Sequence, residues 1–376
     1  MTPTKPPSKS QPDQRTRRRD AARLLLHPDQ LKDSLSLARQ ASLRNATLAG
    51  FQAALTVAVA LPLVVLSPWA HLIGFASLGA LVALFGRFAP AGRRQRIVLH
   101  CGLLQVAGVL LMSAAAWLGA SQALQLILLA VWCGVSLFIS IAGRFGAPGA
   151  LIFVFAASAA IAPQLTLGQV VERTAATAIV AALAWLICLA TEAVRQAPSP
   201  ARDTPAEPFR SRLIAAGRTV AGAAVAIVVS LALDGQHPAW AAMGALAVMQ
   251  GPQLHIVMNR ALQRTGGTAI GALLAWLLLL QDPSVWVLIA VLAALQLLTE
   301  MVIGFNYALG QVLVTPMALL MTYLGAGRAV GSEMASDRIV ETLIGVAVGV
   351  VLSVAFSSAD ERAHLARRRE RPAADR

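Results

Sequence analysis

The sequence predicts an all-α, polytopic membrane protein with about twelve transmembrane helices, arranged as two parallel six-helix repeats. Of its 376 residues, 57% are hydrophobic and 13% are charged, whereas soluble domains average roughly 45–50% and about 25%. The apolar residues form long uncharged blocks, for example 46–66 and 122–142, each near the roughly 20 residues that cross a bilayer as a helix. Basic residues gather in the tails and in alternate connections, which is typical of a multi-pass membrane protein.

Two membrane halves follow from the spacing of these apolar blocks. The first half covers residues 45–193 and the second covers residues 212–358. The expected spans of the first half lie at about 45–66, 69–86, 97–118, 122–142, 145–163 and 170–193. Those of the second half lie at about 212–233, 239–258, 265–281, 284–303, 305–326 and 338–358.

Three polar segments lie outside these halves. Residues 1–44 form a basic tail that is too polar for a cleavable signal peptide, and its first part is expected to be disordered. Residues 29–44 fit either an amphipathic helix on the membrane surface or a solvated lead-in. Residues 194–211 form a Pro-rich linker, and residues 359–376 form a second basic tail.

The distribution of positive charge predicts the orientation. Of the 31 Lys and Arg residues, only Arg173, Arg328 and Arg338 fall on one side of the expected topology. The positive-inside rule therefore places both termini in the cytoplasm. It also explains the net charge of +13 without nucleic acid as a partner.

The two halves share a pattern that predicts an internal repeat. Similar residues and short motifs recur at the second, third and sixth spans, at offsets of 170, 168 and 165 residues. They are Pro68-Trp69 with Pro238-Ala239-Trp240, Arg96 with Arg264, and Arg173-x-x-x-Thr177 with Arg338-x-x-x-Thr342. Because each half has an even number of spans, the expected symmetry axis runs along the membrane normal.

The most specific local pattern is Arg264-x-x-Gly267-Thr268-x-x-Gly271. Gly267 and Gly271 form a small-residue face on which another helix can pack closely. Arg264 lies near the start of an apolar helix, where backbone N–H groups favour an anion. The pattern fits an anion contact in a transport pathway, and it equally fits a positive-inside arginine followed by a packing motif.

Polar residues in the fifth span of the second half suggest a second part of this site. Asn306 and Tyr307 stand where the helix enters the membrane, and Thr315-Pro316 interrupts it near the middle. A proline frees a backbone carbonyl, which is tolerated where it faces a polar cavity or a neighbouring helix. A transport site and a structural kink both remain open.

Glu300 and Glu341 are the candidates for carrying a coupling proton. Carboxylates in or near membrane spans usually face a partner or water, and Glu341 follows Arg338 by three residues, close enough for an ion pair on one helical face. The alternative is that both are interfacial residues at helix ends.

The sequence offers no sign of an enzyme, a cofactor or a metal site. Its three cysteines are scattered in apolar spans, and its histidines have neither i, i+4 partners nor acidic ligand sets. It contains no Walker loop, no Gly-x-Ser-x-Gly elbow and no His-Glu-x-x-His motif.

Residues 212–358 resemble the fusaric acid resistance protein-like (FUSC) or aromatic acid exporter family. The likeness rests on three motifs: Arg264-x-x-Gly267-Thr268-x-x-Gly271, Asn306-Tyr307-x7-Thr315-Pro316, and Arg338-x-x-x-Thr342-x-x-Gly345. The resemblance implies a bacterial inner-membrane exporter of aromatic or other organic acids, distantly similar to plant malate channels. Many members of the family carry a large cytosolic domain, and this chain has only the short linker in that place.

The function predicted from the sequence is therefore proton-driven export of organic anions. Arg264, Gly267, Thr268, Asn306, Tyr307, Thr315, Arg338 and Thr342 are the expected substrate contacts. Gly267, Gly271 and Gly345 are the expected packing positions. The sequence leaves open a passive anion channel and a membrane scaffold without transport. It also leaves open a periplasmic adaptor and the oligomeric state, and the expected partners are small organic anions and membrane lipid.

Overall fold

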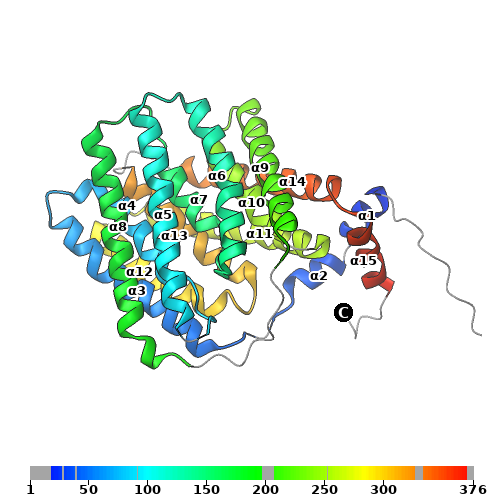
Figure 1. Cartoon of the computed structure of the whole chain (residues 1–376), viewed down its shortest axis with the longest axis horizontal. Helices are drawn as coiled ribbons and strands as arrows, with labels where there is room; N and C mark the ends of the chain where they lie inside the picture. Colours follow the sequence, from blue (N-terminus) through cyan, green and yellow to red (C-terminus); the bar gives the residue numbers. More distant parts are fainter. Residues whose placement is uncertain are drawn as a thin grey trace, which may run out of the picture.

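A computed structural model describes residues 18–27, 29–38, 40–90, 92–196, 207–251, 253–326 and 333–370, and the regular structure of these residues is entirely helical (Figure 1). Most of the linker and part of the connection before the last span lie outside them, as do residues 1–17, which were expected to be disordered.

The first half contains four long helices and two short ones. Serine or threonine hydroxyls accept backbone N–H groups at the starts of α3, α6 and α8, which is the usual N-cap arrangement. The helices are α3 (Leu43–Val65), α4 (Ile73–Ala80), α5 (Arg93–Trp117), α6 (Gln122–Gly143), α7 (Leu151–Ala159) and α8 (Leu167–Ala190). Two 3₁₀ turns, Ala70–Leu72 and Leu81–Leu84, extend α4 at its ends.

The second half also contains six helices, of which only α10 is short. Ser284 caps α12, and Asn306 caps α13. The helices are α9 (Phe209–Ala232), α10 (Pro238–Met249), α11 (Leu254–Leu279), α12 (Val285–Val302), α13 (Tyr307–Gly325) and α14 (Glu333–Ala355).

Eight helices in the described residues are long and apolar enough to cross a membrane, namely α3, α5, α6, α8, α9, α12, α13 and α14. They confirm an all-α polytopic membrane protein, while the count of twelve spans stays a prediction. Two expected spans were wrong in extent. The span at 145–163 contains only the nine-residue α7, because Gly146 and Gly149 turn the chain with positive φ just before it. The span at 239–258 ends with α10 at Met249.

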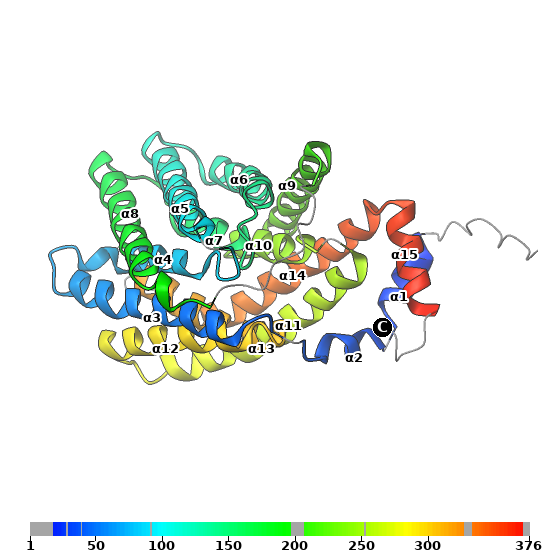
Figure 2. The same ribbon diagram turned by 60° about the horizontal axis from the view of Figure 1, so that its bottom comes forward.

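The short helices lie in the interior. In Figure 2, α5, α6, α8 and α9 lie on one side of the molecule and α12 and α13 on the other, with α4, α7 and α10 between them. Every residue of α4 is buried, and α10 is buried from Trp240 to Val248. Helices that are apolar all round are stable only with such complete cover.

Glycines bring these interior helices into backbone contact with their neighbours. A Cβ atom on Gly79 of α4 would lie 2.7 Å from the Thr177 carbonyl of α8, and one on Gly345 of α14 would collide with the Ala241 carbonyl of α10. On α11, a Cβ on Gly267 or Gly271 would lie 2.7 Å from a carbonyl oxygen of α13. Close approach of this kind is the usual packing of small residues in membranes.

Replacing Gly345 with leucine is expected to lower the thermal stability of the purified protein strongly. The side chain cannot fit without separating α14 from α10, and overpacking of this kind costs about 1–3 kcal/mol or more. The measurement is the surviving monodisperse fraction in size-exclusion chromatography after heating in detergent. Gly217→Ala is the matched control, because no atom lies within 4 Å of the added Cβ, and equal melting of the two variants would contradict the packing.

The terminal segments pack on one end of the bundle. Helices α1 (Arg18–Leu25) and α15 (Ala359–Glu370) lie side by side (Figures 1 and 2). Helix α2 (Asp29–Leu35) is fixed to α11, where the Gln263 side-chain amide donates to the Ser34 carbonyl at 2.6 Å. The amphipathic helix considered for residues 29–44 is therefore shorter than expected and ends at Leu35.

Candidate functional site

Two cavities lie between the two halves. The first, here called the Arg264 cavity, has a volume of about 230 Å³, and the second, the Trp240 cavity, has a volume of about 370 Å³. Phe155 of α7 and Met321 of α13 line both of them, so these two side chains form their common wall.

The cavities face opposite ends of the membrane helices. The Arg264 cavity is bounded by the last residues of the short interior helices, by the turn at Ala147–Pro148 and by Tyr307 at the start of α13. The Trp240 cavity is bounded by Gln236 and His237 before α10 and by Ala326 after α13. The described linings of the two cavities meet at Phe155 and Met321.

Arg264 is held by two side chains of the neighbouring helix. Its guanidinium group donates to the Tyr307 hydroxyl at 3.2 Å and to Gln311 Oε1 at 3.5 Å, and the Gln311 amide donates in turn to Thr315 Oγ1 at 3.1 Å. Arg264 is 1% exposed, and its Nε has no hydrogen-bond partner. An arginine that is held in one orientation and keeps an unpaired N–H donor can bind an anion.

Arg338 lies next to both cavities. It lines the Arg264 cavity, and its guanidinium carbon lies 5.0 Å from the ring centre of Trp240, which lines the other cavity. Its charge is close enough to Arg264 for the two to repel each other, and its Nε lacks a hydrogen-bond partner. Two neighbouring cations without a carboxylate between them favour an anion as the third member.

Glu300 is paired with Arg87, a residue that the sequence had placed in a basic connection. Both side chains are largely buried and line the Arg264 cavity, where their charged groups form an ion pair. Arg87, Arg260, Arg264 and Arg338 thus face this cavity together with one carboxylate, that of Glu300. The described lining therefore carries a net positive charge.

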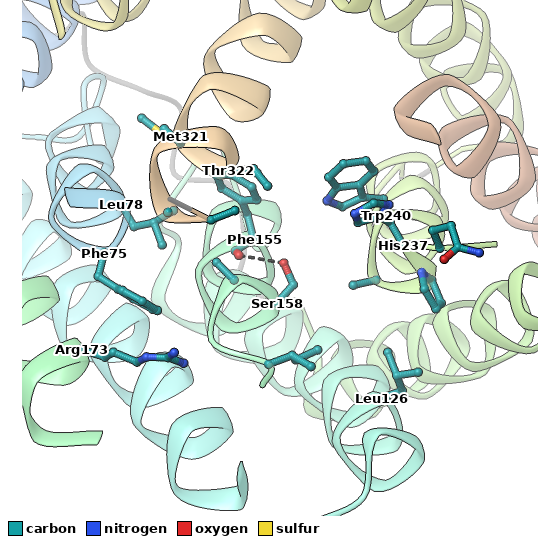
Figure 3. A pocket seen from close by; sticks show the side chains of 18 of the residues that line it. Phe75, Leu78, Leu126, Phe155, Ser158, Arg173, His237, Trp240, Met321 and Thr322 are labelled. Atoms are coloured by element: carbon teal, nitrogen blue, oxygen red, sulfur yellow. Dashed lines mark hydrogen bonds between the residues drawn. The ribbon is translucent and has the colours of Figure 1, made fainter. Parts of the chain in front are cut away.

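The Trp240 cavity has an arginine on one wall and a histidine on the opposite wall. Figure 3 shows Phe75 and Arg173 on one side and Trp240 and His237 on the other. Arg173 lies over the ring of Phe75 at 5.0 Å, and the ring of His237 is stacked on that of Trp240 with centroids 4.1 Å apart. Apolar side chains fill most of the remaining wall, which suits a small organic ion with an apolar body.

The structure brings together only some of the residues expected at the site. Arg264, Tyr307, Arg338 and Glu300 line the Arg264 cavity. Neither cavity is lined by the other expected contacts, which are Gly267, Thr268, Asn306, Thr315 and Thr342. Thr315 acts through Gln311, and Asn306 donates to the carbonyls of Ser34 and Ser36 and so anchors the N-terminal segment.

Glu341 does not form the expected ion pair with Arg338. Its Oε1 accepts hydrogen bonds from the Ser230 hydroxyl at 2.9 Å and from the His237 backbone N–H at 3.2 Å. Ser230 lies near the end of α9 and His237 in the turn before α10, while Oε2 of Glu341 is buried without a hydrogen-bond partner. The helical spacing of three residues allowed the pair, but these donors lie closer to Glu341.

Some buried polar residues escaped the sequence analysis. Arg94, counted with the basic connection after the second span, is 1% exposed and donates to Gln52 Oε1 of α3 at 2.5 Å. Phe155 and Met321, which line both cavities, were not singled out from the sequence either. The described residues contain no group of three or more His, Cys, Asp or Glu side chains that could hold a metal ion.

Comparison with known proteins finds a family match within the second half. No solved structure matches the chain. An uncharacterized membrane protein of Bacillus subtilis (strain 168), YvaC, is 41% identical over 83 residues, which are 22% of this chain and 13% of that protein. This chain thus spans a small part of the relative's length. Residues 223–352 match the family model described as fusaric acid resistance protein-like, and the resemblance predicted from the sequence is therefore confirmed over those residues.

Proposed function

We propose that this protein is a transporter of organic anions in the bacterial inner membrane, with both termini in the cytoplasm. The observation that carries the proposal is the Arg264 cavity, where the buried residues Arg87, Arg264 and Arg338, from three parts of the chain, face one space whose described lining contains a single carboxylate. Buried charges are expensive in a membrane protein and usually mark a substrate pathway. The match to the fusaric acid resistance protein-like family supports export and organic acids as substrates.

The route runs from the Arg264 cavity to the Trp240 cavity. With cytoplasmic termini, the Arg264 cavity opens to the cytoplasm and the Trp240 cavity to the outside. An anion would enter at Arg264 and Tyr307, meet Arg338, and pass the Phe155–Met321 wall when it opens. Arg173 would then face the anion in the second cavity.

Corresponding contacts in the two halves support the twelve-span, two-repeat arrangement. The pair Arg173 and Phe75 is matched by Arg338 and Trp240, and each guanidinium carbon lies 5.0 Å from the ring centre. The close approach of Gly79 to the Thr177 carbonyl is matched by Gly244 and Thr342. Each of these residues is separated from its counterpart by 165 residues. Helix pairs repeat as well, since α3 packs on α12 as α9 packs on α6.

Glu300 is the better of the two candidates for proton coupling. Its carboxylate neutralises Arg87 inside the cavity, so protonation of Glu300 would release Arg87 to bind the substrate anion. Glu341 lines neither cavity. A passive anion channel is the second candidate function. It is favoured if the ion pair between Arg87 and Glu300 stays intact during transport, because Glu300 then takes up no proton.

Flux in proteoliposomes tests the proposal. We expect labelled aromatic and aliphatic acids to accumulate against their gradient when a pH gradient is imposed, beyond the uptake of protein-free liposomes. Glu300→Gln should keep downhill flux and lose accumulation. Flux that does not depend on the pH gradient would contradict the proton-driven carrier and support the channel. The absence of flux for every acid would contradict both and support a scaffold without transport.

A further inference from the structure

His237, which lines the Trp240 cavity, forms a pair with a carboxylate. His237 lies in the turn before α10, and its Nδ1 is 3.2 Å from Asp337 Oδ2 of α14. Both side chains are about 30% exposed, at 31% and 28%. The imidazole therefore reaches the cavity and water together.

Protonation of His237 changes the charge of this wall by one unit. With a neutral imidazole, Asp337 leaves a negative charge behind His237, close to the cavity, which repels an anion. With a protonated imidazole, the pair is neutral and Arg173 acts on the anion without opposition. Histidine is the side chain whose ordinary titration falls between pH 5 and 8.

The other charged groups near His237 are accounted for among the described residues. From α14, Glu341 accepts the His237 backbone N–H, and Arg338 shares the Trp240 ring. Arg173 of α8 faces His237 across the cavity (Figure 3). Asp234 lies in the same turn, where its carbonyl accepts from Gln236. The described lining contributed by α6, α7 and α13 is uncharged.

We propose that the Trp240 cavity is a second anion-binding site, formed by Arg173 and the His237–Asp337 pair, and that protonation of His237 strengthens its hold on an organic anion. This site deepens the transport function proposed above and rests on it. It would make retention of the anion at this end of the route depend on the pH of the solution there.

Equilibrium binding of labelled benzenesulfonate to the detergent-purified full chain tests this site. The charge of a sulfonate does not change near neutral pH, so any pH dependence belongs to the protein. We expect the wild-type protein to bind about fivefold more tightly at about pH 6 than at about pH 8, the effect of one charge at about 4 Å in water. Arg173→Ala should weaken binding at the lower pH most.

Two histidine variants separate the site from a general pH effect. His237→Gln should bind at both pH values with the affinity of the wild type at about pH 8. His71→Gln is the matched control, because His71 lies before α4 as His237 lies before α10, pairs with Glu172 at 3.3 Å, and lines neither cavity. It should keep the wild-type pH dependence.

The outcomes distinguish this inference from the proposed function. Binding that does not change with pH, or a pH dependence that persists in His237→Gln, would overturn the second site while leaving anion binding in the Arg264 cavity intact. No binding at either pH would overturn both.

Discussion

Replacing Arg338 with alanine is expected to abolish anion flux and to leave the protein at least as stable as the wild type. Arg338 is 4% exposed, lies beside both cavities and repels Arg264. Losing a buried charge that holds an anion costs about 2–5 kcal/mol, and every 1.4 kcal/mol is about tenfold in affinity. Flux at low substrate should therefore fall by about 30-fold or more. The measurement is initial uptake in proteoliposomes, with thermal unfolding in detergent as the parallel readout.

The combination of lost flux and retained stability is specific to a residue kept for function. Arg338 gives up its hydration without an ion-pair partner among the described residues, so its removal relieves an unfavourable charge. Arg338→Lys should restore part of the flux, because it keeps the charge but loses the planar group over Trp240. Arg210→Ala, an exposed arginine at the start of α9, should leave flux unchanged. If Arg338→Ala takes up the substrate at the wild-type rate, Arg338 does not bind the anion during transport.

Arg264 and Arg338 could be found from the sequence because each begins a short motif of small and polar residues that leads into an apolar helix. The close packing of Gly267, Gly271 and Gly345 was predictable for a similar reason, since glycines four residues apart form a continuous smooth face on a helix. Each now lies against a neighbouring backbone. These predictions depended only on residues close together in the sequence.

Arg87 and Arg94 could not be found in this way. They stand in the arginine-rich connection 87–96, where the positive-inside rule already explains an arginine. Only the fold shows that the chain turns inward after Gly86, which has a positive φ, and that both side chains are buried. A charge pattern gives the side of the membrane, but it does not distinguish a solvated arginine from one that faces a cavity.

The interior helices were predictable in position but not in length. Helices α4 and α10 are apolar on every face, so hydropathy continues smoothly into the flanking residues and does not mark where they end. Short helices at corresponding positions of two halves are the usual sign of a transport site. Here Leu84, at the end of the 3₁₀ turn that follows α4, and Ala247, near the end of α10, line the Arg264 cavity.

Replacing Phe155 with alanine is expected to join the two cavities and to produce a leak. The ring of Phe155 and the side chain of Met321 are the only parts of the described lining that both cavities share, and an apolar constriction stops ions by excluding water. A barrier lowered by 1.36 kcal/mol raises a rate about tenfold, so we expect chloride efflux from proteoliposomes to rise at least about tenfold. Accumulation driven by a pH gradient should disappear at the same time.

Two further variants test whether the effect comes from the position of the ring. Phe155→Trp enlarges the wall and should reduce flux, the opposite direction from alanine. Phe153→Ala removes another ring of α7. The Phe153 ring is stacked on that of Phe85, with centroids 5.0 Å apart, and it lines neither cavity. This variant should therefore lower thermal stability without a chloride leak. A leak in Phe153→Ala as large as that in Phe155→Ala would mean that loosening α7, and not opening a wall between two cavities, lets ions through. An alanine variant at Phe155 that stays tight to chloride would show that Met321 and its neighbours close the route without the ring.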